Sequence, residues 1–158
     1  MKTNTGVTLI ELMVVIAIIS ILALMAIPSF QQKFVRDQIA EASSWAALAK
    51  TPIAAYWITN RALPPDNASI GLPAADKVVS NLVRSLSVEG GAIHMTFGNL
   101  ANGQLRGKTL TFCPALVDDS PVIPIAWVCG FAQAPANMCV HGVNRTDIAR
   151  ELLPLTCK

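Results

Sequence analysis

The feature that most constrains this chain is an apolar run of twenty-one residues, 7–27, which holds a single charge and neither glycine nor proline. As a helix rising about 1.5 Å per residue, the run is long enough to cross a hydrocarbon core of roughly 30 Å. Its one charge is Glu11. A carboxylate inside such a span costs on the order of 3 kcal/mol on insertion scales, so Glu11 is a candidate functional residue.

The six residues ahead of the run, MKTNTG, differ from a secretory signal. Such a signal has a positive start, a short apolar core and then a small-residue cleavage site. Here Lys2 and Gly6 both precede the apolar run. Two interpretations are open: an uncleaved anchor that keeps Lys2 in the cytoplasm, and a leader that is cut between Gly6 and Val7.

The four cysteines lie in the last third of the chain, at Cys113, Cys129, Cys139 and Cys157. An even number outside a membrane span indicates two disulfides in an oxidising compartment, with three possible pairings. A hairpin centred near Pro121 would place Cys113 opposite Cys129. A zinc site is disfavoured, because the chain has no C-x-x-C pair and its two histidines show no ligand spacing.

Charge and polar residues give little indication of a ligand. The formal net charge is +2, and no five-residue run carries one sign. A balance so near neutral does not by itself indicate nucleic acid as a partner. The spacing of serine, histidine and aspartate also marks no nucleophile, base and orienting group.

Apolar residues continue at steps of three to five beyond the run, which predicts one helix of about fifty residues. This helix begins in the membrane span and ends as the spine of a soluble domain. Pro28 and Pro52 each remove an amide donor and are expected to bend it. The predicted stripe comprises Ile27, Phe30, Phe34, Ile39, Ala42, Ala46, Ala49, Ile53 and Trp57.

The rest of the chain predicts an antiparallel sheet. Residues 59–85 read as a connection with a short helix around 75–83. Strand patterns follow at 92–97, 108–112 and 125–131, with a glycine-asparagine turn after the first. We therefore expect an α+β fold, in which a meander of three or four short strands turns its apolar face to the helix.

The N-terminal residues resemble the signature of type IV prepilins, which carry a class III signal peptide. The shared pattern is a short basic leader that ends in Gly6, followed by Thr8, two aliphatic residues and Glu11, with Pro28 near the end of the buried segment. The family usually starts its mature chain with phenylalanine, whereas this chain has Val7 at that position.

This resemblance implies three parts: a leader, 1–6; a membrane-embedded, filament-core half of the helix, 7–30; and a periplasmic pilin domain, 31–158. It implies cleavage after Gly6 and N-methylation of Val7. The new amino group of Val7 would pair with Glu11 of a neighbouring subunit, and Pro28 would permit local melting in the filament. The alternative for Glu11 is that it reaches the membrane surface near the helix start.

The C-terminal third also resembles pilins of the type IVa group, in W-V-C-G and in a cysteine just before the C-terminus. In that family these two cysteines commonly pair. The resemblance implies a Cys129–Cys157 bond, which closes a C-terminal loop, and it leaves Cys113 with Cys139.

The resemblance implies a structural subunit of a type IV pilus, made as a single-pass inner-membrane protein and then assembled outside the cell. Adhesion, twitching motility and DNA uptake would follow from the filament. Expected partners are copies of the chain, the prepilin peptidase, the inner-membrane assembly platform with its ATPases, the outer-membrane secretin, and a host surface or DNA. No catalysis, cofactor, metal or small-molecule substrate is expected.

Three alternatives stay open. A minor pilin that acts as a DNA receptor would need a basic patch. A type II secretion pseudopilin shares the N-terminal signature but generally lacks the two-disulfide region. A periplasmic enzyme with an uncleaved anchor would keep Met1. The candidate DNA-binding cations are Arg106, Lys108, Arg145, Arg150 and Lys158.

Overall fold

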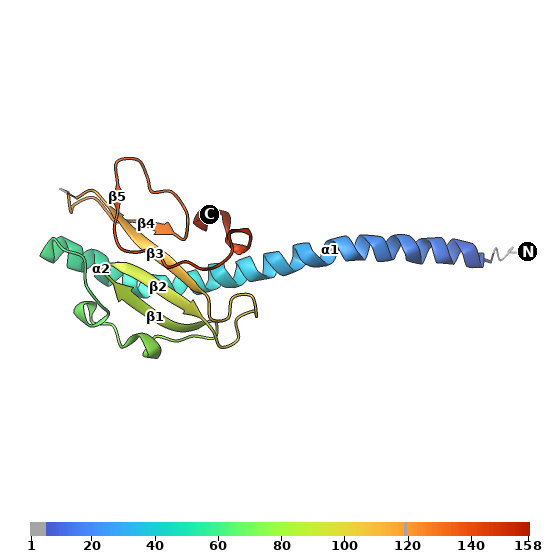
Figure 1. The fold of residues 1–158 in the computed structure, drawn as a ribbon, viewed down its shortest axis with the longest axis horizontal. Coiled ribbons are helices and arrows are strands. Elements are labelled where there is room, and N and C mark those ends of the chain that lie inside the picture. Colours follow the sequence, from blue (N-terminus) through green and yellow to red (C-terminus); the bar gives the residue numbers. More distant parts are fainter. Residues whose placement is uncertain (1–5, 119) are drawn as a thin grey trace, which may run out of the picture. The chain divides into compact units, whose positions relative to one another are not determined.

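The computed structural model describes residues 6–118 and 120–158, apart from the side chains of 26–29, and Figure 1 shows its elements along the chain. The chain divides into two units, Met1–Phe34 and Val35–Lys158, which are described separately. The first unit holds most of helix α1. The second holds the end of α1, helix α2 and the whole sheet. The predicted hinge residue Pro28 lies outside the described side chains.

The long predicted helix is confirmed. Helix α1 (Leu9–Ser43) and helix α2 (Ala47–Asn60) are separated only by a 3₁₀ turn, Ser44–Ala46. Helix α2 continues through Pro52, whose missing amide donor leaves the carbonyl of Leu48 without an intrahelical partner. The helix ends where Arg61 adopts a left-handed conformation and donates its N–H to the carbonyl of Trp57.

The sheet is antiparallel, in the order β1-β2-β3-β4, and this confirms the predicted α+β class. A fifth strand pairs with the end of β3, beyond the point where β2 stops. The strands are β1 (Val83–Glu89), β2 (Ala92–Phe97), β3 (Thr109–Leu116), β4 (Ala126–Cys129) and β5 (Cys139–Val140).

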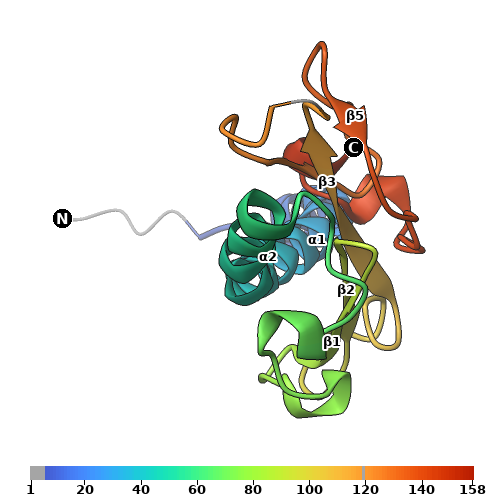
Figure 2. The same ribbon diagram turned by 90° about the vertical axis from the view of Figure 1, so that its left-hand side faces the viewer.

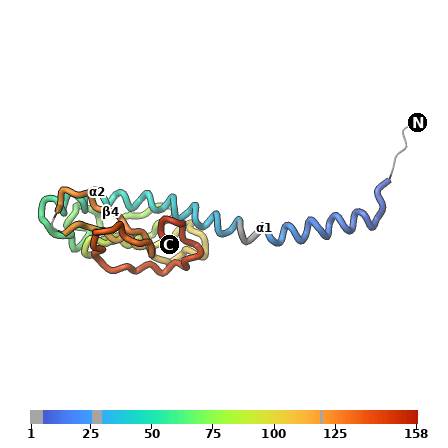
Figure 3. Tube along the Cα trace, turned by 90° about the horizontal axis from the view of Figure 1, so that it is seen from above, coloured from blue at the N-terminus to red at the C-terminus, as the bar shows by residue number. Residues whose placement is uncertain are grey.

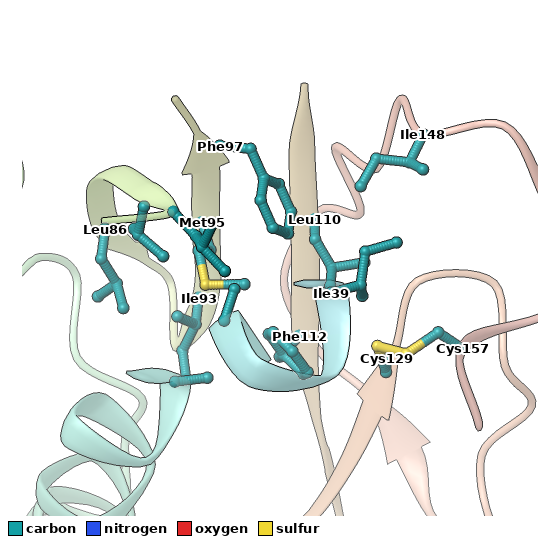
Figure 4. Close-up of a cluster of buried hydrophobic side chains, with 14 of the residues drawn as sticks. Ile39, Leu86, Ile93, Met95, Phe97, Leu110, Phe112, Cys129, Ile148 and Cys157 are labelled. Atoms are coloured by element: carbon teal, nitrogen blue, oxygen red, sulfur yellow. A yellow bond between two sulfur atoms is a disulfide. The ribbon is translucent and has the colours of Figure 1, made fainter. Parts of the chain in front are cut away.

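Within the second unit the helix covers one face of the sheet and the first part of the C-terminal loop crosses the other, as Figures 2 and 3 show from two directions. The last residues of the loop return to the helix side, where Nη2 of Arg36 donates a hydrogen bond to the carbonyl of Glu151. One face of β2 and β3 turns inward through Ile93, Met95, Phe97, Leu110 and Phe112, which are buried with residues of the helix. Figure 4 shows these side chains grouped around Ile39 and the neighbouring disulfide. The helix and the sheet therefore share one core.

The buried side of the helix follows the predicted stripe only in its second half. Ile39, Ala42, Ala46, Ala49, Ile53 and Trp57 are buried as predicted. Phe30 and Phe34 are instead exposed, and Val35 is the first buried residue among the side chains that the structure describes. Ile27, at the start of the predicted stripe, lies outside these side chains. Three fully buried alanines bring the helix backbone close to the sheet, since a side chain of one carbon needs little space.

Strand β1 was missed, and the short helix predicted around 75–83 is wrong beyond a 3₁₀ turn at Ala75–Lys77. A register irregularity between Val83 and Ser85 explains the missed strand. The buried residues Val83 and Leu86 are three residues apart, whereas Leu86 and Val88 are two residues apart. The bulge therefore breaks the alternation by which a strand is recognised in sequence.

The predicted strand 108–112 extends to Leu116, through Pro114. Proline usually argues against a central strand because it cannot donate to the ladder. Here β2 pairs with β3 only as far as Phe112, so the missing N–H of Pro114 lies past that ladder. Its carbonyl still accepts a hydrogen bond from the N–H of His141, 2.9 Å away.

The close helix–sheet contact yields a stability prediction. Ala49→Leu is expected to lower the free energy of unfolding by about 1–3 kcal/mol, because added methyl groups must displace a packed core. Ala55→Leu is the matched control, since Ala55 lies exposed on the same helix. Urea unfolding of the detergent-solubilised chain, followed by tryptophan fluorescence, measures both. Equal effects of the two substitutions would contradict the packing described here.

Candidate functional site

The first unit exposes an unusually apolar helix. Every large apolar side chain from 9 to 25 is between 47% and 77% exposed. A helix of this length and composition can cross a membrane. Water alone is a poor environment for so large an apolar surface, so either lipid or other protein is needed to cover it.

Thr8 and Glu11 begin this helix as a capping pair. The hydroxyl of Thr8 accepts a hydrogen bond from the N–H of Glu11 at 3.3 Å, and its carbonyl accepts one from Leu12 at 3.2 Å. A threonine followed three residues later by a glutamate is the sequence pattern of a capping box, and the helix dipole favours a carboxylate here. Thr8 therefore caps the helix, and the helix dipole favours the Glu11 carboxylate in the first turn.

The carboxylate of Glu11 is exposed and forms no salt bridge with any residue of 6–118 or 120–158. Gly6 and Val7 precede the helix and are exposed, and apart from its chain neighbours no described residue lies within 4 Å of where a Cβ of Gly6 would be. Cleavage and methylation at this position stay predictions.

The second unit is closed by a disulfide between Cys129, at the end of β4, and Cys157, one residue from the C-terminus. This is the bond that the resemblance implies. Gly130 turns the chain away from β4 with a φ of 57°, and a Cβ there would lie 2.7 Å from the carbonyl oxygen of Cys157. The glycine of the W-V-C-G motif is thus required by the close approach of the terminal segment.

The predicted bond between Cys113 and Cys139 is wrong, and both cysteines are free. Cys139 pairs with Leu116, three residues along β3 from Cys113. Neighbouring side chains on a strand point to opposite faces, so an odd separation places the two sulfur atoms on opposite sides of the sheet. Cys113 is accordingly buried, while Cys139 is exposed.

The same register rules out the other pairing that the sequence left open. Cys113 lies opposite Val128 on β4, and Cys129 lies opposite Phe112. The side chains of Cys113 and Cys129 therefore point to opposite faces, although their strands are adjacent. A hairpin was rightly expected between them, but it is offset by one residue from the arrangement that a disulfide requires.

A buried polar pair lies beneath the C-terminal loop, and sequence reasoning did not identify it. Nδ1 of His94 lies 3.0 Å from the hydroxyl of Thr111, and both residues are buried. The same hydroxyl accepts a hydrogen bond from the N–H of Arg145 in the loop. Burial is the main cause that lowers the pKa of His94, and the nearby positive charge of Arg145 lowers it further. The negative charge of Glu89 acts in the opposite direction and raises this pKa.

The candidate DNA-binding cations do not form an unpaired patch. Lys108 lies 3.7 Å from a carboxylate oxygen of Asp147, and Arg145 lies 2.6 Å from one of Glu89. The guanidinium of Arg150 stacks over the ring of Phe131. Two of the five cations are therefore charge-paired, whereas Arg106, Arg150 and Lys158 form no salt bridge with a described residue.

The described residues, 6–118 and 120–158, contain no cluster of three histidine, cysteine or acidic side chains that could hold a metal ion. Their most distinctive chemistry is the exposed apolar helix with a carboxylate, Glu11, in its first turn. The class of protein defined by this arrangement is a helix-spined α+β subunit with a disulfide-closed C-terminal loop.

Comparison with known proteins identifies the family. The family described as Pilin (bacterial filament) matches residues 35–158, and the prokaryotic N-terminal methylation motif matches residues 1–27. The chain therefore belongs to the pilin family, and it is a structural subunit of a pilus.

Relatives match both parts of the chain. A type IV major pilin protein PilE1 of Neisseria gonorrhoeae is 33% identical, covering 97% of this chain and 86% of the relative. A fimbrial protein of Neisseria meningitidis serogroup A is also 33% identical, covering 97% and 93%. Fimbrial protein EcpC of Eikenella corrodens is 38% identical, covering 81% and 83%. The resemblance to type IV pilins is confirmed.

The disulfide predicts that substitution of a bonded cysteine lowers the free energy of unfolding far more than substitution of a free cysteine. Cys129→Ser is expected to lower the free energy of unfolding by about 3–4 kcal/mol, the chain-entropy value for a loop of this length. Cys139→Ser, at an exposed free thiol, should change it by less than about 0.5 kcal/mol. Thermal unfolding of both variants provides the measurement. A similar loss at Cys139 would contradict the connectivity.

His94 predicts a pH dependence of stability. Because its pKa is lower in the folded chain than in the unfolded chain, the unfolded chain binds the extra proton first. Stability should be constant above pH 7 and fall as the pH drops below about 6.5, by at most about 1.4 kcal/mol per pH unit. Denaturant unfolding between pH 7.5 and 5.5 measures this slope. His94→Gln should remove it, and an unchanged slope in that variant would contradict the assignment.

Proposed function

We propose that this pilus subunit is made as a membrane-inserted precursor that is cut between Gly6 and Val7, and that the helix of residues 7–30 then packs against the same helix of other copies. The observation that carries the proposal is the exposed apolar surface of residues 9–25, which nothing in the second unit needs for its own core. Methylation of the Val7 amine by the processing enzyme is part of the proposal.

The role proposed for Glu11 follows from the cost of burying its charge. Cleavage creates an ammonium group at Val7, four residues before the glutamate. Each charge alone is costly in an apolar filament core, whereas the two together attract strongly at low dielectric. Within one chain, the capping arrangement points the Glu11 amide back to Thr8. We propose that the carboxylate pairs with the Val7 amine of a neighbouring copy.

The partners and location proposed are those of a type IV pilus. The precursor crosses the inner membrane once and is processed by a prepilin peptidase. An inner-membrane platform with assembly and retraction ATPases moves it into a filament, which passes an outer-membrane secretin. Relatives bear the names of major pilins and fimbrial proteins, and we propose the same building role here, with adhesion and twitching motility as its consequences. The chain itself would carry no catalytic step.

The test for Glu11 separates its charge from its capping role. Glu11→Gln keeps a side chain that can cap the helix but removes the charge. We expect normal membrane insertion and an N-terminal peptide that still starts at Val7. The yield of filament should fall at least tenfold, because the remaining charge of the pair is then buried without its partner. Filaments sheared from the cell surface and quantified by immunoblot provide the measurement.

Ser20→Ala is the matched control for Glu11→Gln. Ser20 is the other polar side chain in the middle of the span, and its hydroxyl donates to the carbonyl of Ile16 in its own helix. Its loss should leave filament yield unchanged. Normal piliation by the Glu11→Gln variant would refute the pairing, and a precursor that retains Met1 in filaments would refute the cleavage.

A further inference from the structure

Lys50 is a cation without a carboxylate partner in the part of the second unit that the structure describes. It lies on α2 and is half-buried. Its Nζ is 4.6 Å from the ring centroid of Phe112 and 5.7 Å from that of Trp127. Burial also lowers the pKa of Lys50. The ammonium group lies beside two aromatic rings, and an anion could still approach it.

A groove of about 350 Å³ opens beside this lysine. We call it the basic groove, and define it by Ala40, Lys50, Phe112, Trp127, Thr156 and the Cys129–Cys157 disulfide. It runs along the flank of the helix that faces β4. Its walls are mainly apolar or aromatic, with the hydroxyl groups of Ser43 and Thr156 among them. No acidic side chain lines it, and the disulfide fixes one wall.

The other flank of the same helix carries the opposite charge. Asp37 and Glu41 are exposed there, one helical turn apart, and neither forms a salt bridge with a described residue. Like charges at this spacing repel each other. Trp45 and Leu48 continue the flank and are 37% and 48% exposed. We call these four residues the acidic flank.

The basic groove and the acidic flank cannot meet within one chain. Glu41 and Lys50 are nine residues apart, which at 3.6 residues per turn places them on about opposite sides of the helix. Glu41 and Trp45 border a hollow formed with Ser80–Leu82, next to β1. The basic groove lies next to β4. Because β1 and β4 are the two ends of the sheet order, the surfaces lie at opposite edges of the unit.

Two different surfaces with opposite charge suit a contact between copies that repeats. When two copies meet through unlike patches, the pair still has one free patch of each kind and can bind further copies. Such contacts build an open helical array when the rotation between neighbouring copies does not close a ring. Opposite charges on the two patches steer and orient such an encounter. Because the chain is a pilus subunit, a second copy of the chain is the occupant that we consider.

We propose that the acidic flank of one copy docks in the basic groove of the next. The Glu41 carboxylate lies against Lys50, and Trp45 covers the aromatic wall formed by Phe112 and Trp127. This contact belongs to the second unit alone. It goes beyond the pairing of Glu11 with Val7 and does not depend on it.

Charge reversal with rescue tests this contact in the full-length chain. Lys50→Glu and Glu41→Lys should each lower the yield of sheared filaments by about tenfold, because like charges then face each other at the contact. The double variant Lys50→Glu with Glu41→Lys should restore most of the yield. A small organic anion in the groove predicts instead that Glu41→Lys has no effect, and that outcome overturns the proposal.

Asp76→Lys and Lys77→Glu are the matched controls. Both residues are exposed, and they lie on a 3₁₀ turn away from the basic groove and the acidic flank. Each reversal changes the net charge of the chain by the same amount as its counterpart at Glu41 or Lys50. Filament yield should be unchanged in both, and a tenfold loss in either would show that net charge, rather than the proposed contact, controls assembly.

Cross-linking of unmodified filaments decides the question even if a variant fails to fold. A zero-length carbodiimide reagent joins a lysine amine to a carboxylate only when the two are in contact. Mass spectrometry of filaments mixed from light and heavy isotope-labelled subunits should reveal a Lys50–Glu41 or Lys50–Asp37 peptide containing one light and one heavy half. Cross-links from Lys50 only to other carboxylates, or none, would overturn the proposal. This readout is independent of Glu11, so it can fail while the proposed helix packing stands.

Discussion

The structure depends on one constraint: the apolar surface of residues 9–25 has no cover within its own unit, and it begins with a carboxylate. A membrane can cover the apolar side chains but makes the charge of Glu11 costly. A bundle of identical helices can cover both, provided that each chain also supplies a positive group. Removal of the leader would supply that group at Val7. The same helix therefore suits storage in a bilayer and, after one cleavage, a filament core.

Within the second unit, the end of α1 and helix α2 lie on a firm support. Buried alanines hold the helix against the sheet, and the Cys129–Cys157 bond ties the terminal segment to β4. Both flanks of the helix stay open, one with Lys50 beside two aromatic rings and one with Asp37 and Glu41, which form no salt bridge with a described residue. A fold that buries one side of a helix and leaves two unlike flanks exposed is well suited to repeated, directional contacts.

Sequence alone predicted the parts of this molecule that depend on long or specific patterns. The helix, strand β2 and the bond between Cys129 and Cys157 follow from periodicity and from the W-V-C-G resemblance. Prediction from sequence failed where one additional residue changes the register of a strand. The bulge in β1 hides a strand, and an offset of three residues separates Cys113 from Cys139. The pairing of His94 with Thr111, and the place of Lys50 between two rings, depend on contacts across strands that no local pattern records.

The central claim is that Glu11 pairs with Val7 of another copy, and a distance between labelled chains tests it most directly. Filaments would be grown from two mixed populations, one with ¹⁵N at the Val7 amine and the other with ¹³C at the Glu11 carboxylate. Solid-state NMR dipolar recoupling between the two labels reports only contacts between chains. The account predicts a separation of about 4 Å, that of a direct ion pair. Absence of any coupling in well-ordered mixed filaments would contradict it.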